Sequence, residues 1–403
     1  MTGLGSTISN LSRLRRNWSR TLNGAAETTH ARRAPPVPSR LQPVASFGTN
    51  PGNLRMYEYA PKTVGPSPAL VVVLHGCTQT AAGYDHGTGW STLADEHGFV
   101  LLYPEQQAAN NPKTCFNWFE PGDIRRDAGE AKSIRQMIDW MIAEHGVDRS
   151  RVYVTGLSAG GAMAGVMLAT YPEVFGGGAI IAGLPYGTAG NVQEALSSMF
   201  QGRTKDARQW GDLVRAASPH RGPWPRVSVW HGGADTTVKP TNATETVKQW
   251  SNVHGVSGTP ALESKGPGFT RQVWRNGAGE EVVESFTFAG MAHGTPLAAG
   301  VGEGQSGVAG PFLLDVGVSS THHIAKFFGL APAPQAGVAR DAAPAWQPTG
   351  VIEFAPKADE APRPRAEPGP QADWHGSRKP GGLPIDVNAV ITKALKAAGL
   401  MRS

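Results

Sequence analysis

The sequence predicts an α/β fold, in which helices cover both faces of a mostly parallel central sheet. Residues 69–74 and 99–104 are short apolar runs, as expected of strands that are buried on both faces. Segments with helical periodicity alternate with such runs along the chain. This alternation is typical of parallel strands joined by right-handed helical crossovers.

The first part of the predicted sheet contains strands of two kinds. Residues 54–59 alternate apolar and polar side chains, which predicts an edge strand. Residues 69–74 predict a central strand that ends in the sequence His75-Gly76-Cys77, and residues 99–104 predict another buried strand. Residues 92–97 suit the helix that connects these two strands.

The clearest predicted helix follows residue 127. Asp127 and Glu130 have the spacing of a capping box, which marks the start of a helix. The apolar face of this helix consists of Ile134, Met137, Ile138, Met141 and Ile142. The helix leads into a strand at residues 152–155, where β-branched and aromatic side chains gather.

The later part of the chain supplies the remaining predicted strands. They lie at residues 179–182, 226–231 and 282–288, and we expect the one at 282–288 to be the last. Residues 187–221 are polar and compatible with helix, and they occupy a position suited to a cap insertion.

These patterns divide the chain into four regions. We expect a basic N-terminal extension at residues 1–45, the α/β domain at 46–330, a proline-rich disordered linker at 331–384 and an amphipathic helix at 385–403. Both ends are predicted to be flexible extensions whose helices dock on the body or on a surface. Their apolar stripes are Ile8, Leu11, Leu14, Trp18 and Leu22, and Val387, Val390, Ile391, Ala394, Leu395 and Ala398.

Composition and charge exclude several classes of protein. The formal net charge is +5, and the basic cluster near the N-terminus has no groove-reading motif beside it, which favours a solvated tail over nucleic-acid binding. We expect no transmembrane span, because no run of 18 apolar residues occurs. The start of the chain shows no recognisable signal peptide.

The chain has two cysteines, Cys77 and Cys115. Two cysteines exclude a disulfide framework and any four-cysteine metal site, and a single bridge remains possible. We expect no metal.

The sequence RVYVTGLSAGGAMA at residues 151–164 carries the strongest chemical signal. It places Gly156-Leu157-Ser158-Ala159-Gly160 between a strand and a helix of small residues, which is the setting of a nucleophile elbow. The glycines leave room for a sharp turn that exposes the Ser158 hydroxyl at the edge of the sheet. The pattern predicts that Ser158 is a catalytic nucleophile.

A serine nucleophile needs a histidine as base and an acid that orients the histidine. Asp235 follows the strand at 226–231 in a glycine-rich loop, whereas Asp206 and Asp212 lie in polar, helix-like sequence. His293 ends the strand at 282–288 in a second glycine-containing loop. The chain order of serine, acid and histidine is that of α/β-hydrolases.

Four other histidines are weaker candidates for the base. His322 and His323 fit the start of a closing helix better, and His231 and His254 lack the required position. We therefore expect Asp235 and His293 to act with Ser158.

Acyl transfer also requires donors for the developing oxyanion. We expect the backbone amide of Ala159, directly after the nucleophile, to be one of them. The backbone amide of Cys77, in the loop after the strand at 69–74, is the expected second donor. Cys77 itself is not favoured as a nucleophile, because only His75 is near it in sequence.

With these residues in place, the chain resembles the poly(3-hydroxybutyrate) depolymerase family of esterases across residues 45–330. The motifs that carry the resemblance are LHGCTQTA (74–81), CFNWFEP (115–121), GLSAGGAM (156–163), WHGGADTTVKPTNATETVKQW (230–250), GMAHG (290–294) and LDVGVSSTHHIAKFFGL (314–330). The resemblance implies an α/β-hydrolase fold with Ser158 as nucleophile, Asp235 as acid and His293 as base.

The resemblance also bears on location and on the cysteines. Members of the family are typically extracellular, with a cytoplasmic location as the alternative for a chain that lacks a recognisable signal peptide. Export favours a Cys77–Cys115 bridge over two reduced, buried thiols, and this bridge would join the oxyanion loop to the aromatic segment at 116–119. Trp118 and Phe119 either line the substrate site or pack in the core.

The sequence therefore predicts a serine esterase that cleaves carboxylic esters through an acyl-enzyme without metal or organic cofactor. The family also contains feruloyl and acetylxylan esterases, so a polyester, an acylated polysaccharide and a small soluble ester all remain candidate substrates. A non-catalytic binding protein with a hydrolase fold is the alternative of another class, and the complete set of triad residues argues against it.

Overall fold

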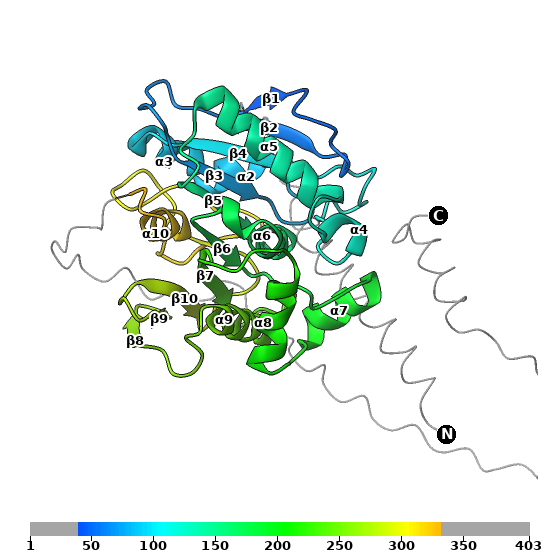
Figure 1. The fold of residues 1–403 in the computed structure, drawn as a ribbon. Coiled ribbons are helices and arrows are strands. Elements are labelled where there is room, and N and C mark those ends of the chain that lie inside the picture. The colour runs from blue at the N-terminus through cyan, green and yellow to red at the C-terminus, as the bar shows by residue number, and fades with distance from the viewer. Residues whose placement is uncertain (1–38, 332–403) are drawn as a thin grey trace, which may run out of the picture. The chain divides into compact units, whose positions relative to one another are not determined.

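The computed structural model describes residues 39–331, and their main element is a ten-stranded sheet (Figure 1). The six central strands pair in parallel, and the two outer strands on each side pair antiparallel. In that order they are β1 (Gln42–Val44), β2 (Arg55–Tyr59), β4 (Val100–Glu105), β3 (Leu70–Leu74), β5 (Val152–Leu157), β6 (Gly177–Ile181), β7 (Arg226–Gly232), β10 (Glu281–Phe288), β9 (Phe269–Arg275) and β8 (Leu262–Gly266).

Helices cover both faces of this sheet, as predicted (Figure 1). One face carries α5 (Gly129–His145), α6 (Ala159–Thr170), α7 (Val192–Gln201), α8 (Ala207–Ala216) and α9 (Thr241–Val253). The opposite face carries α2 (Ala81–Thr88), α3 (Trp90–His97) and α10 (Ser320–Phe327). Short elements complete the described chain: α4 (Pro121–Ile124), the 3₁₀ turn η1 (Pro172–Val174), and the two-stranded sheet of β11 (Thr295–Leu297) and β12 (Leu313–Asp315).

The central strand β3 shows why the two faces hold separate cores. All of its residues are buried, and they alternate between the two sides of the sheet. Leu70, Val72 and Leu74 belong to the core cluster under α5 and α6, whereas Val71 and Val73 belong to the cluster under α2, α3 and α10. A continuous apolar run therefore reports burial on both faces.

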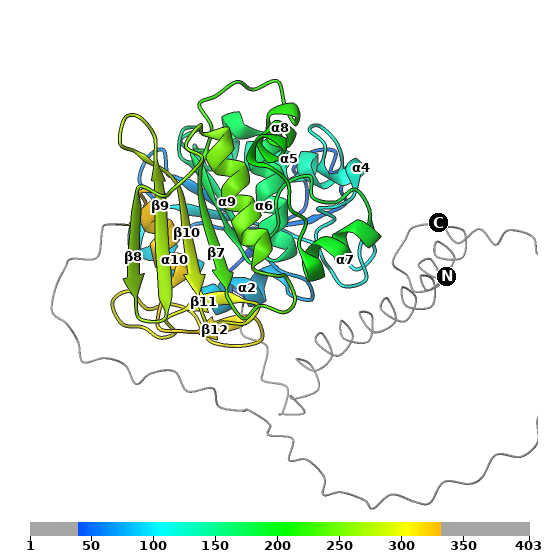
Figure 2. The same ribbon diagram turned by 90° about the horizontal axis from the view of Figure 1, so that it is seen from below.

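Two expectations about strand positions are wrong. The strand predicted as an edge strand, β2, lies between β1 and β4, because the three residues of β1 pair with it. β1 is too short to leave a pattern in the sequence, and it lies within the predicted extension at residues 1–45. The strand β10 is not the last one, since β11 and β12 follow it (Figure 2).

The hairpin of β8 and β9 was not predicted. Their antiparallel pairing extends the sheet beyond β10 (Figure 2), and β8 has exposed side chains along most of its length. The turn sequence Gly266-Pro267-Gly268 between them is a signal that identifies such a hairpin.

The predicted capping box at residues 127–130 is also wrong. The N-cap of α5 is Ala128, which makes no side-chain cap. Asp127 has a left-handed backbone, with φ of 62°, and its side chain accepts a hydrogen bond from the Tyr171 hydroxyl. The Glu130 carboxylate is buried and accepts hydrogen bonds from the Asn117 amide and the Gln106 side chain. Both side chains that a capping box requires, those of Asp127 and Glu130, are therefore engaged in tertiary hydrogen bonds.

The remaining elements agree with the sequence patterns. The five apolar residues predicted for α5 are buried, and α7 and α8 occupy the polar region at 187–221. No helix within residues 39–331 is long and apolar enough to cross a bilayer. The predicted terminal stripes, linker and C-terminal helix lie outside the described residues.

The helix α6 packs so closely against the sheet that every one of its residues is buried. A Cβ atom on Gly160 would lie 2.3 Å from the Leu74 carbonyl oxygen and 2.5 Å from that of His75. A Cβ atom on Gly165, later in the same helix, would meet only ordinary contacts, the nearest at 3.6 Å from Ile180 Cδ1. The first turn of α6 therefore requires glycine, and the second does not.

This contrast predicts opposite effects of two alanine substitutions in one helix. Gly160→Ala should lower the free energy of unfolding by at least ~1–3 kcal/mol, because rigid backbone atoms must move. Gly165→Ala is the matched control and should be neutral or raise it by up to ~1 kcal/mol, since alanine favours helix. Urea denaturation measures both, and equal stability of the two variants would contradict the packing described here.

Candidate active site

Ser158 lies at the sharp turn between β5 and α6. Its backbone has φ of 58° and ψ of −116°, an unusual conformation for a residue with a side chain. The Ser158 amide donates to the Ile181 carbonyl of β6 at 2.8 Å. A Cβ atom on Gly156 would lie 2.5 Å from the backbone of Gly160, so the two motif glycines are in close contact. The predicted elbow geometry is present.

Asp235 lies in the loop that follows β7. Its Oδ1 atom accepts hydrogen bonds from the backbone amides of Thr237 and Val238, both at 2.8 Å. The residue is 2% exposed. Two amide donors hold the carboxylate in one orientation, and its Oδ2 atom points to two histidines.

His293 lies in the loop that follows β10, and its Nδ1 atom donates to Asp235 Oδ2 at 2.7 Å. Because the Nδ1–H group of His293 donates to the carboxylate, Nε2 is the ring nitrogen that remains to face a substrate or a nucleophile. The structure therefore brings the predicted acid and base together. β5, β7 and β10 are all parallel, so Ser158, Asp235 and His293 follow strands that end at the same edge of the sheet.

Backbone contacts hold the loops of Asp235 and His293 against each other. A Cβ atom on Gly232 would lie 2.1 Å from the Met291 carbonyl oxygen, so only glycine allows this approach. The Gly233 amide donates to the Phe288 carbonyl at 2.7 Å, and the Ala234 amide donates to the Met291 carbonyl at 3.1 Å. The Gly-Gly pair before Asp235 thus fixes Asp235 relative to His293.

The environment of Asp235 favours its ionised form. Burial alone would raise the pKa of its carboxyl group, but the hydrogen bonds from His231 and His293 outweigh burial and hold that pKa well below its ordinary value. The acid is therefore a carboxylate at neutral pH, which is the form that orients a histidine and stabilises its imidazolium.

Three of the four histidines judged less suitable as the base, and His75 with them, have other surroundings. His322 and His323 lie on α10, as predicted, and burial lowers the pKa of His323 to about 4. His254 follows α9, and its Nε2 atom hydrogen-bonds the Pro225 carbonyl. His75 is buried, with Nδ1 bonded to the Gly76 carbonyl and Nε2 accepting from the Gln106 amide. None of these four rings contacts Asp235 within residues 39–331.

The loop after β3 is held in place by a disulfide between Cys77 and Cys115, as favoured from the sequence. The Thr78 amide adds a hydrogen bond to the Lys113 carbonyl at 2.7 Å. The Gly76 amide donates to Gln79 Oε1, and the Gln79 backbone amide donates to the Gly76 carbonyl. The neighbouring amides are thus engaged, whereas that of Cys77 donates to no group within the described part of the chain.

Ala159 is the first residue of α6, so its backbone amide has no acceptor within the helix. It directly follows Ser158 at the positive end of the helix dipole. The amides of Ala159 and Cys77 are therefore free to bind an anion. The close contact of Gly160 with Leu74 and His75 packs α6 against the end of β3, where the Cys77 loop begins.

The aromatic segment after Cys115 is mostly internal. Trp118 is 6% exposed and belongs to the core cluster under α5 and α6, and Phe119 is half-buried against it. Their rings meet edge to face at 5.3 Å between centroids. Phe119 has the greater share of exposed surface, and the assignment of both residues to substrate binding stays a prediction.

Two neighbours of the site were not among the predicted residues. His231 Nε2 lies 3.3 Å from Asp235 Oδ2, although His231 was considered only as a base. The Phe312 ring meets the His293 ring edge to face at 6.0 Å, and Phe312 has a left-handed backbone with φ of 62°. The four-residue spacing of His231 and Asp235 in WHGGAD is a usable signal, whereas nothing local to Phe312 identifies it.

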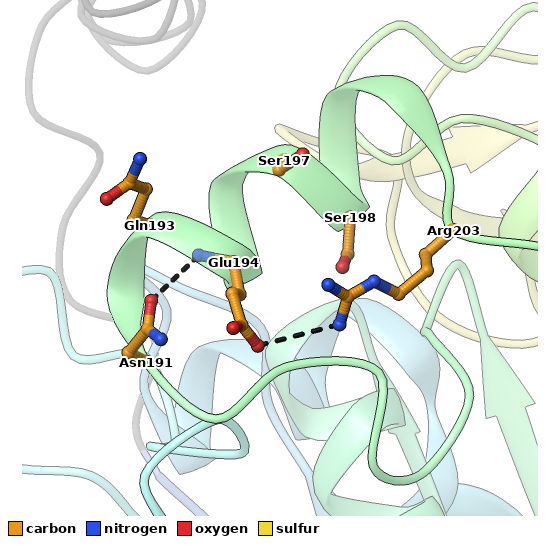
Figure 3. Close-up of a pocket in the computed structure, with 6 residues that line it drawn as sticks. All are labelled: Asn191, Gln193, Glu194, Ser197, Ser198 and Arg203. Carbon is orange, nitrogen blue, oxygen red and sulfur yellow. Dashed lines mark hydrogen bonds and ion pairs between the residues drawn. The ribbon is translucent and has the colours of Figure 1, made fainter.

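A separate pocket of about 320 Å³ lies on α7 within the predicted cap region (Figure 3). Its lining is polar, and an ion pair joins Glu194 and Arg203 across it (Figure 3). The residues that line it are Asn191, Gln193, Glu194, Ser197, Ser198 and Arg203. Ser158, Asp235 and His293 are not among them, so this pocket is distinct from the candidate site.

Comparison with known proteins decides the family. The model of the esterase PHB depolymerase family matches residues 57–272. The chain belongs to this family. It is therefore a carboxylic ester hydrolase with an α/β-hydrolase fold.

Curated relatives of this esterase include enzymes named for different substrates. Poly(3-hydroxyalkanoate) depolymerase C of Paucimonas lemoignei is 50% identical over 291 residues, which cover 72% of this chain and 70% of the relative. An acetylxylan esterase of Coprinopsis cinerea is 36% identical and covers 65% and 71% of the two chains. Feruloyl esterase B of Neurospora crassa is 37% identical and covers 69% and 94%.

A solved structure supports the fold of this esterase. The acetyl xylan esterase from Aspergillus awamori superposes with a TM-score of 0.61 at 28% identity. The match covers 72% of this chain and 99% of the other. The likeness therefore spans the whole of that solved chain.

The disulfide predicts a measurable contribution to stability. Replacing both cysteines by alanine, Cys77→Ala with Cys115→Ala, should lower the free energy of unfolding by about 3–4 kcal/mol, because the bridge closes a loop of 38 residues in the unfolded chain. Chemical denaturation measures this loss. A reductant should lower the melting temperature of the wild type and leave the double variant unchanged; a reductant effect of equal size on both would contradict the prediction.

Proposed function

We propose that this esterase uses Ser158, Asp235 and His293 as a catalytic triad. The observation that carries the proposal is the hydrogen bond from His293 to the buried Asp235 carboxylate, at the sheet edge where the strained Ser158 elbow also lies. In this mechanism His293 Nε2 takes the proton of the Ser158 hydroxyl as its oxygen attacks the ester carbonyl. Asp235 keeps the ring oriented and stabilises the imidazolium that forms.

The backbone amides of Ala159 and Cys77 act as the oxyanion hole in this mechanism. Both are free of acceptors in the described part of the chain, and preorganised amides stabilise the charge that develops on the carbonyl oxygen. His293 then donates its proton to the leaving alcohol, which gives the acyl-enzyme. A water molecule deprotonated by His293 attacks the acyl group and releases the acid and free Ser158.

Labelling with a fluorophosphonate probe tests the nucleophile. The wild type should be labelled at Ser158 and should lose esterase activity with it, whereas Ser158→Ala should show neither labelling nor turnover. Ser197→Ala removes an exposed serine from α7 and is the matched control, with labelling and activity equal to the wild type. Equal labelling of wild type and Ser158→Ala would refute the assignment, and no turnover by folded wild type would favour the non-catalytic alternative.

We propose a polyester of hydroxyalkanoic acid as the substrate. The depolymerase of Paucimonas lemoignei is 50% identical, whereas the acetylxylan and feruloyl esterases reported above are 36–37% identical. The Cys77–Cys115 bridge also supports an oxidising, extracellular compartment, where a polymer is met directly. A carbohydrate esterase is the second candidate, because the solved acetyl xylan esterase shares the fold over its whole length.

A hydrolysis panel distinguishes these substrates. Amorphous polyhydroxybutyrate should be cleared, with release of soluble hydroxy acid, and methyl ferulate and acetylated xylan should react at least about tenfold more slowly, as expected when a site discriminates by several contacts. Short-chain nitrophenyl esters report the state of the triad, and Ser158→Ala is the blank in each assay. A higher kcat/KM on ferulate or acetylated xylan would assign the carbohydrate function instead.

A further inference from the structure

His231 is a buried histidine beside the proposed triad that the mechanism above does not use. It lies near the end of β7 and is 1% exposed. Its Nε2 atom is 2.8 Å from the Val238 carbonyl oxygen and 3.3 Å from Asp235 Oδ2. Its Nδ1 atom has no hydrogen-bond partner among the described residues.

The contacts of His231 determine which nitrogen carries the proton. A carbonyl oxygen only accepts, so Nε2 must be the protonated nitrogen that faces Val238. The same N–H is close enough to Asp235 Oδ2 to be shared between the two acceptors. Nδ1 is left buried without a donor, which is a free-energy cost that a hydrophobic side chain at this position would not incur.

The hydrogen-bonding needs of the Asp235 carboxylate explain why a histidine at position 231 is useful despite this cost. An ionised carboxylate has about four lone-pair sites. Oδ1 uses two of them on the amides of Thr237 and Val238, and Oδ2 uses one on His293 and lies 3.3 Å from His231 Nε2. His231 is therefore the second N–H group beside the oxygen atom that binds His293.

We propose that His231 is a positioning residue for catalysis: its Nε2–H holds Asp235 Oδ2 in place and limits the negative charge that this oxygen directs at His293. The proposal rests on the triad assigned under the proposed function. His231 touches neither the substrate nor Ser158 in this role, and it acts only through Asp235.

The sign of its effect on pH dependence follows from the groups around the carboxylate. The titratable groups that face Asp235 are His231 on β7 and His293 on the loop after β10. Hydrogen bonds from both act against burial to keep the pKa of Asp235 low. Without the N–H of His231, more of the negative charge on Oδ2 is directed at His293 and favours the charged form of its ring. A base works only when unprotonated, so activity should begin at a higher pH.

The substitution His231→Leu tests the proposal, because leucine fills similar space without an N–H. We expect kcat to fall roughly tenfold with KM little changed, since a misoriented base slows the chemical step rather than binding. The acid limb of the kcat/KM profile should move upward by about half a pH unit or more. The assay uses the full-length protein with a short-chain nitrophenyl ester as soluble substrate.

Two amide substitutions separate the N–H from the shape of the ring. The side-chain amide of His231→Gln reaches the position of Nε2 and should restore the wild-type profile. The shorter side chain of His231→Asn cannot reach it and should behave like the leucine variant. This pair keeps the test decisive even where leucine prevents folding, because both variants are polar.

His254→Leu is the matched control, since His254 is a partly buried histidine whose Nε2 also meets a backbone carbonyl, but it does not contact Asp235. It should change stability without moving the acid limb. The proposal is overturned if folded His231→Leu keeps the wild-type kcat and acid limb, or if His231→Gln is as impaired as His231→Asn. Activity retained by Ser158→Ala would instead refute the triad itself, so the two failures are distinguishable.

Discussion

The parallel pairing of β5, β6, β7 and β10 is the constraint on which the rest of the site depends. Parallel strands end at one edge of a sheet, so loops that are 77 and 58 residues from Asp235 in sequence, at Ser158 and His293, return to the same place. The helices between the strands bury the sheet on both faces, which leaves this edge as the place where polar groups collect. The sheet thus assembles chemistry that no local segment holds.

Close backbone contact converts this common edge into a defined geometry. Gly160 lets α6 approach the end of β3, and Gly232 lets the acid loop approach the base loop, each at distances that a Cβ atom would forbid. The disulfide and the Thr78 hydrogen bond hold the Cys77 loop in the same way. Rigid backbone, rather than flexible side chains, therefore sets the relative positions of Ser158, Asp235, His293 and the amides of Ala159 and Cys77.

Burial of the acid carries a cost that hydrogen bonds offset. A buried carboxylate loses its hydration, and Asp235 regains donors from two backbone amides and two histidines. The unpaired Nδ1 of His231 and the strained backbone of Ser158 are further costs at the same site. Local costs concentrated in this way are typical of a functional site, where geometry is selected over stability.

The sequence by itself determined the α/β class, the central strands, the elbow at Ser158 and the choice of Asp235 and His293 as the residues that pair. Each of these follows from a local signal, such as an apolar run, a glycine-flanked serine or a polar residue directly after a strand. Only the tertiary structure decided the place of β1, the contacts that Asp127 and Glu130 make in place of a capping box, and the contact of Phe312 with His293. These depend on partners that are distant in sequence, and the energies of such contacts override local preference without leaving a pattern along the chain.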